Sequence, residues 1–142
     1  MHKEVIIAVT GTQVNEYGET DAQELITKGT YYQKNGAYFI VYTESEITGM
    51  AGTTTFVKVE QAQARVTLNR AGISQHKQVF ETGLRHQGNY ITPCGVMSIV
   101  VNTSKVEVDL TDIGGSIKLE YELEVENEKV SDNTLSLAVR EA

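Results

Sequence analysis

Apolar and polar residues alternate along several stretches of this chain, most regularly from Ile117 to Val125. Every odd position in that stretch is apolar and every even position is charged. A period of two places one set of side chains on each face of a β-strand, whereas a helix would spread the same residues around its whole surface. The pattern therefore predicts a strand with one face on a core and the other face in water.

Weaker versions of the same pattern recur along the chain and predict about ten strands. They fall at residues 5–9, 21–33, 37–46, 53–60, 64–70, 75–82, 85–92, 96–101, 106–110 and 117–125, with a last strand that contains Leu135 and Val139. Turn residues separate them. The Asn35-Gly36 pair tolerates positive φ and predicts a tight hairpin, and Pro93 cannot donate to a central ladder and predicts a break.

Short strands at regular spacing, without a convincing long helix, are typical of a β-sandwich or a β-barrel. Consecutive hairpins make an antiparallel meander, and closing the meander removes the exposed edges that invite aggregation. We therefore predict an all-β fold, an antiparallel up-and-down closed β-barrel of about eight to ten strands. A chain of 142 residues is expected to form a single domain over 1–142. An immunoglobulin-like sandwich is the alternative, although the chain has no Trp and no cysteine pair.

The charge and composition limit the partners and the compartment. A net charge of −7 disfavours nucleic acid and anionic membranes, since both are bound through clustered Lys and Arg. No apolar run approaches the ~20 residues of a membrane span, and the N-terminus lacks the apolar stretch of a signal peptide. Cys94 is the only cysteine, so an internal disulfide is excluded. These features predict a cytoplasmic protein.

Several segments have a familiar order and spacing: Ile47 to Lys58, Leu68 to Gly72, Val79 to Gly83 and Gly114 to Tyr121, together with Tyr31-Tyr32, Tyr38, Tyr42 and Glu44. In this combination the chain resembles the YwiB-like family of small bacterial proteins of unknown function. The resemblance implies a calycin-like or lipocalin-like antiparallel barrel in the bacterial cytoplasm. It implies no reaction, cofactor or catalytic residue.

Arg70 is the most informative single residue for function. It continues the strand face of Val66 and Leu68, so the period of two directs its guanidinium inward. A buried arginine needs a carboxylate or an anionic ligand, because an unpaired buried charge is costly. Two interpretations stay open: an internal ion pair with Glu44 or Glu81, or an anchor for an anionic ligand at the barrel mouth.

Five further residues complete the candidate ligand site. Tyr42 and Glu44 share one strand face with Tyr38, and tyrosines with an apolar body and a polar tip suit binding cavities. Thr55 is placed to line a polar rim, and His76 is a candidate acid or base because an unperturbed histidine titrates near neutral pH. Each of these residues is also compatible with ordinary barrel packing.

Other chemistry has little support in the sequence. The three histidines have no metal-ligand spacing, so we expect no metal site, and no glycine-rich phosphate loop is present. We expect no cofactor and assign no catalytic residue. The leading hypothesis is a non-catalytic module that binds a small, anionic or amphipathic molecule in the barrel interior or mouth. The alternative is a filled barrel that docks a protein partner or a second copy, and an enzyme ranks below both.

Overall fold

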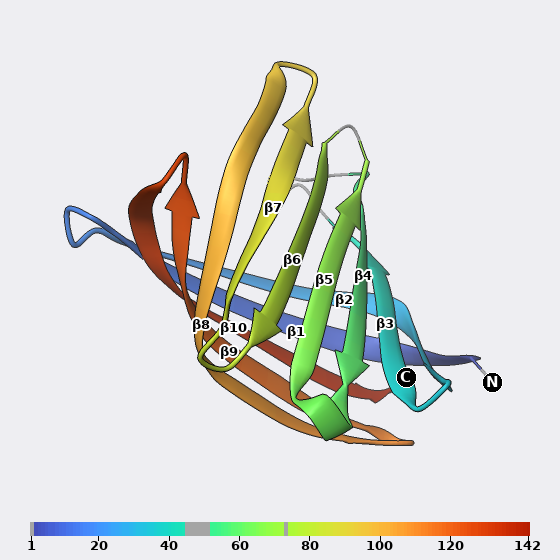
Figure 1. Ribbon diagram of the computed structural model, residues 1–142. Coiled ribbons are helices and arrows are strands. Elements are labelled where there is room, and N and C mark those ends of the chain that lie inside the picture. Colours follow the sequence, from blue (N-terminus) through green and yellow to red (C-terminus); the bar gives the residue numbers. More distant parts are fainter. Residues whose placement is uncertain (1, 45–51, 73) are drawn as a thin grey trace.

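The computed structural model describes residues 2–44, 52–72 and 74–142. Their strands form one antiparallel sheet in which each strand pairs with its chain neighbours, and β1 closes the barrel by pairing with β10 (Figure 1). The strands are β1 (His2–Asn15), β2 (Thr20–Lys34), β3 (Ala37–Thr43), β4 (Thr54–Glu60), β5 (Arg65–Ala71), β6 (Gln75–Glu81), β7 (Arg85–Thr92), β8 (Gly95–Thr111), β9 (Gly114–Val125) and β10 (Glu128–Glu141). The 3₁₀ turn η2 (Gln61–Gln63) connects β4 to β5.

The predicted closed barrel is confirmed, and the sandwich alternative is wrong. The Asn35-Gly36 hairpin also forms as expected, with positive φ at both residues. The predicted strand over 37–46 ends at Thr43, and positions 45–46 lie outside the described residues. The first strand is longer than the pattern indicated, because β1 continues to Asn15 in register with β2 and β10.

One difference from the predicted strands has a clear physical reason. The two strands expected at 96–101 and 106–110 are parts of one strand, β8, with a β-bulge between Thr103 and Lys105. Val101 and Thr103 face inward before the bulge, and Val106 faces inward after it. One extra residue reverses the odd–even alternation while the backbone ladder continues. The sequence pattern therefore looked like two strands.

The core lies inside the barrel and consists of the inward side chains of most strands. Ile117 and Leu119 of the sharply alternating stretch are 1% and 0% exposed, whereas Lys118 between them faces solvent. The other buried apolar side chains include Val5, Ile7, Tyr31, Ile40, Val57, Val59, Val66, Leu68, Phe80, Leu137 and Val139. Among the described residues, no helix is long and apolar enough to cross a membrane.

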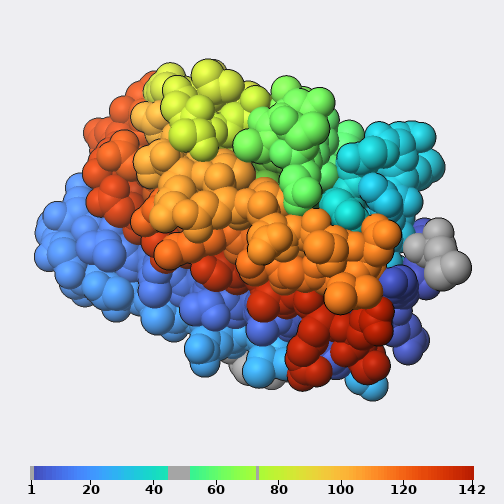
Figure 2. Space-filling view, turned by 90° about the horizontal axis from the view of Figure 1, so that it is seen from below, coloured from blue at the N-terminus to red at the C-terminus, as the bar shows by residue number. Residues whose placement is uncertain are grey.

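The barrel has one end at the chain termini and another at the turn between β7 and β8. Figure 2 views the molecule from below, and the β8–β9 segment (orange) crosses the middle of that face between β1–β2 (blue) and the β4–β5 connection (green). The β2–β3, β4–β5 and β8–β9 turns lie at the terminal end. These two ends are where inward side chains meet solvent, and they contain the candidate sites.

Candidate functional site: the two ends of the barrel

Four of the predicted site residues form a continuous row across four strands. The ladders pair Tyr42 with Thr55, Thr55 with Arg70, and Arg70 with His76, from β3 to β6. Directly paired residues on one face of an antiparallel sheet are close neighbours. Glu44 follows β3 on the same face, and its side chain is only 2% exposed. The structure thus brings together five of the six predicted residues.

Arg70 forms an internal ion pair with Glu44, one of the two partners named from the sequence. Its Nε lies 3.5 Å from Glu44 Oε1, and the hydroxyl of Thr55 donates a 2.6 Å hydrogen bond to the same oxygen. Glu81, the other partner considered, lies instead 3.1 Å from Arg65 Nε and 2.9 Å from His86 Nε2. The carboxylate of Glu44 therefore supplies the charge that a buried arginine requires.

Two nitrogens in this row lack a hydrogen-bond acceptor among the described residues. Arg70 Nε is within ion-pair distance of Glu44 without a hydrogen bond, and His76 Nε2 has no partner. The His76 ring packs against Tyr90 with ring centroids 4.8 Å apart. Burial, followed by the neighbouring Arg70 charge, lowers the pKa of His76 to about 4. The imidazole is therefore neutral at pH 7, and the row carries one positive and one negative charge.

Tyr38, the sixth predicted residue, lies at the opposite, terminal end of the barrel. Its ring stacks on Tyr31, with centroids 5.5 Å apart and planes inclined by 4°. These tyrosines border a cavity of about 340 Å³ that is also lined by Lys3, Tyr32, Gln33 and Asp112. We call this cavity the tyrosine mouth.

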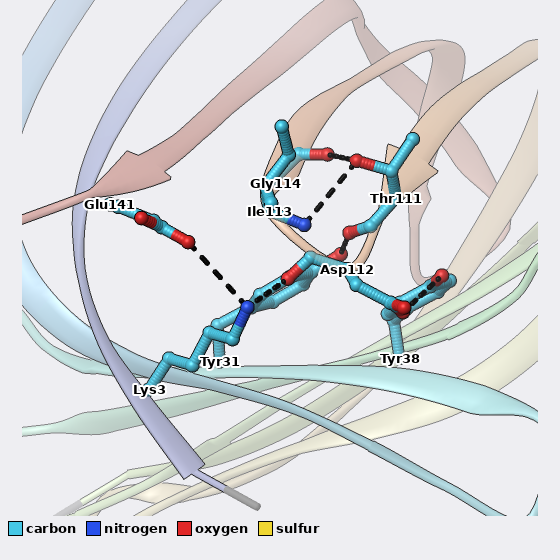
Figure 3. A network of polar contacts seen from close by, with 8 residues as sticks. All are labelled: Lys3, Tyr31, Tyr38, Thr111, Asp112, Ile113, Gly114 and Glu141. Atoms are coloured by element: carbon cyan, nitrogen blue, oxygen red, sulfur yellow. Dashed lines mark hydrogen bonds and ion pairs between the residues drawn. The ribbon is translucent and has the colours of Figure 1, made fainter.

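The turn between β8 and β9 is tied across the tyrosine mouth (Figure 3). The hydroxyl of Tyr31 donates a 2.6 Å hydrogen bond to the Thr111 carbonyl, and Lys3 Nζ donates one of 2.8 Å to the Asp112 carbonyl. Tyr38 donates to Asp112 Oδ1 at 3.4 Å, and Lys3 also lies 3.5 Å from Glu141. Two carboxylates and one ammonium group thus surround the tyrosine rings.

Burial raises the pKa of Tyr31 above its ordinary value, and the neighbouring Tyr38 and Asp112 act in the same direction. Burial and then Asp112 likewise raise the pKa of Tyr38. Both hydroxyls therefore stay protonated at neutral pH and act as hydrogen-bond donors. What this mouth offers a ligand is flat apolar surface with a few fixed polar groups.

Lys3, Tyr31 and Asp112 line the tyrosine mouth but were not predicted as site residues. Tyr31 had a usable signal, because a two-residue Asn35-Gly36 hairpin places it diagonally across from Tyr38 on the same face. Lys3 and Asp112 had none, since they are 109 positions apart and meet only when the barrel closes.

A larger groove of about 460 Å³ lies elsewhere on the barrel and includes Thr12, Asn102, Ser104, Glu120, Glu122 and Asp132. Most of its lining is hydroxyl, amide and carboxylate groups on outward-facing positions. Lys105 pairs with Glu120 at 3.6 Å, and Lys129 pairs with Glu122 at 3.2 Å. Each of its carboxylates thus has a lysine partner, although Glu122 and Asp132 share Lys129. Tyr121 is the aromatic residue in its described lining, whereas three tyrosines line the tyrosine mouth. In the part of the chain that the structure describes, no group of three or more His, Cys, Asp or Glu residues is arranged to hold a metal ion.

The fold and its two ends define a small closed β-barrel protein with its core inside the barrel. A family model described as "Domain of unknown function (DUF1934)" matches residues 7–137, and the chain belongs to this family. The chain is 27% identical over 116 residues to "Uncharacterized beta-barrel protein YwiB" of Bacillus subtilis, covering 82% of this chain and 79% of that protein. The crystal structure of the ywiB protein from Bacillus subtilis superimposes with a TM-score of 0.82 at 18% identity, covering 99% of this chain and 93% of the other. The comparisons thus give the family and the barrel fold, and the expected resemblance is confirmed.

Proposed function

We propose that this protein is a non-catalytic binding module that holds a small amphipathic molecule in the tyrosine mouth. The observation that carries the proposal is the 340 Å³ cavity bordered by the stacked Tyr31 and Tyr38. Its volume lies in the range of about 300–1,000 Å³ that is usual for ligand pockets. We also propose, from the sequence, that the protein is cytoplasmic and that its barrel is similar to those of calycins.

The surrounding charges favour an uncharged ligand over an anionic one. Asp112 and Lys3 line the mouth, Glu141 pairs with Lys3, and the whole chain carries a net charge of −7. An anion would therefore approach through an unfavourable field. A ligand with a planar apolar face fits the Tyr38 ring, and Asp112 is positioned to accept a hydrogen bond from its polar end.

The protonation states support binding over catalysis. Both tyrosines keep their protons well above neutral pH, because burial and Asp112 raise the pKa of each. A general acid or base works best with a pKa near the operating pH. Stacking and hydrogen bonding are therefore the interactions these side chains supply.

Native mass spectrometry of the protein purified from its own host tests the proposal, combined with titration of the uncharged planar dye Nile red. The informative variant is Tyr38→Leu, and the matched control is Tyr17→Leu, which removes a tyrosine that is 79% exposed on the β1–β2 turn. We expect a retained small molecule and dye binding in the wild type and in Tyr17→Leu, with both lost in Tyr38→Leu. Retention or dye binding that is equal in all three proteins, or absent from all three, would contradict the proposal.

A protein-interaction module is the second candidate, and it rests on exposed apolar residues. Ile91, Val96 and Met97 near the β7–β8 turn are 45%, 62% and 41% exposed. Two segments, residues 37–41 and 96–101, have apolar residues on both strand faces in the sequence. They argue less strongly for an interaction surface, because other side chains of the barrel cover much of them. Ile99, Val100 and Val101 are all buried, and Phe39 stacks on Tyr32 at 5.0 Å. A concentration-independent monomer in sedimentation equilibrium, with no partner retained, would argue against this candidate.

A further inference from the structure

A second cavity lies beside the Arg70–Glu44 ion pair, at the opposite end of the barrel from the tyrosine mouth. It measures about 60 Å³, and the described residues that line it come from β1, β2, β3, β5 and β10 and the residue that follows β3. Tyr42, Glu44 and Arg70 form its polar side, while Val9, Leu25 and Leu135 form its apolar side. The exposed residues Gln23 and Glu24 lie at its outer lip. The space suffices for a headgroup of a few non-hydrogen atoms.

The charges beside this cavity select the kind of headgroup it accepts. Arg70 contributes one positive charge and Glu44 one negative charge, while His76 behind Arg70 is neutral because burial and Arg70 lower its pKa. An anionic headgroup would leave two negative charges against one positive charge in a largely buried site, and a cationic headgroup would do the reverse. Unbalanced buried charge is expensive. A neutral group with one acceptor and one donor matches both residues.

We propose that this cavity binds the primary carboxamide end of a small molecule with a short apolar tail. The carboxamide oxygen accepts a hydrogen bond from the Arg70 guanidinium, and its NH₂ group donates to the Glu44 carboxylate. The tail lies along Val9, Leu25 and Leu135. The site shares no lining residue with the tyrosine mouth, so it does not depend on the proposed function.

Three ligands of the same length isolate the headgroup: butyramide, butyrate and n-butanol. Titrations followed by NMR, using the methyl signals of Val9, Leu25 and Leu135, give the dissociation constant of each. We expect butyramide to bind at least about tenfold more tightly than butyrate or butanol. Equal or tighter binding of butyrate would overturn the proposal in favour of an anion anchor. If none of the three ligands shifts these methyl signals, the proposal is overturned and the cavity holds water alone.

Two variants at the cavity and one control make the test specific, each checked for the wild-type fold by circular dichroism before titration. Glu44→Gln keeps the shape of the side chain and leaves a net positive site, so the preference is expected to move from butyramide to butyrate. Val9→Leu fills part of the cavity while leaving both charges, and we expect it to weaken butyramide binding. Tyr17→Leu, which removes an exposed tyrosine that lines neither cavity, serves as the control and is expected to leave the affinity for butyramide unchanged. The proposed site would be contradicted if Glu44→Gln still preferred butyramide, or if Val9→Leu bound butyramide as tightly as the wild type does. Nile red binding tests the tyrosine mouth separately.

Discussion

If the Arg70–Glu44 ion pair stabilises the barrel, removing either charged side chain should destabilise the protein by leaving the other charge buried and unpaired. Arg70→Met keeps most of the apolar stem and leaves the Glu44 carboxylate, which is 2% exposed, without its cation. Removing one member of a buried ion pair costs about 3–5 kcal/mol. The Arg70 side chain is 18% exposed, so we expect a cost at the lower end of that range. The substitution should lower the free energy of unfolding by about 3 kcal/mol.

A double-mutant cycle separates the interaction from the loss of each side chain. Glu44→Gln keeps an acceptor for the Thr55 hydroxyl, which now donates to the carboxylate at 2.6 Å. The Arg70→Met/Glu44→Gln protein carries neither charge, so it avoids the buried unpaired carboxylate. We expect the double mutant to be about 2 kcal/mol more stable than the summed losses of the two single mutants predict. This difference is the coupling energy, and its size is usual for residues in contact.

Urea unfolding at pH 7, followed by circular dichroism with a constant m-value, measures all four proteins. High salt supplies the discriminating condition, since screening acts less on buried pairs than on exposed ones. The matched control is Lys105 with Glu107, an ion pair of 3.0 Å whose side chains are 40% and 58% exposed, and salt should remove its coupling. A coupling below about 0.5 kcal/mol for Arg70 and Glu44, or one that disappears in salt, would refute the reasoning.

Three other changes test further contacts by the same unfolding assay. The pKa of His76 is lowered to about 4, so the unfolded chain binds more protons up to about pH 6.5 and stability rises with pH across that window. His76→Phe should remove about 3 kcal/mol of this rise, and an unchanged pH profile would argue against a neutral His76. Gly115→Ala should cost about 3 kcal/mol or more, because φ is +147° and a Cβ would overlap the Asp109 carbonyl oxygen; wild-type stability would contradict this steric account. Tyr31→Phe should cost about 1 kcal/mol by removing the 2.6 Å hydrogen bond to Thr111, and an equal loss in Tyr17→Phe would show the effect to be nonspecific.

Much of the fold could be predicted because its causes are local. The alternation from Ile117 to Val125 depends only on the two-residue period of a strand, and the Asn35-Gly36 turn depends only on positive φ. A series of such hairpins leaves few topologies, and edge protection favours the closed one. The bulge in β8 could not be predicted, because one inserted residue breaks the alternation without ending the strand.

The candidate sites were predictable to different degrees. Arg70 was placed inward because it follows Val66 and Leu68 on one face, and the same argument applies to Tyr42. That Arg70 pairs with Glu44 and not with Glu81 depends on the register between β3, β4 and β5. Tyr38 and Tyr42 both face the core as expected, but they line different cavities because one strand face extends from one end of the barrel to the other.

The sequence by itself determined which face of most strands is apolar, where the tight turns fall and that successive strands form hairpins. These properties come from a backbone period and from turn conformations that involve only neighbouring residues. Only the tertiary structure decided which inward side chains meet, as with Lys3 and Asp112, which are 109 positions apart. The pairing of β1 with β10 and the bulge in β8 determine these contacts, because each fixes the register between strands.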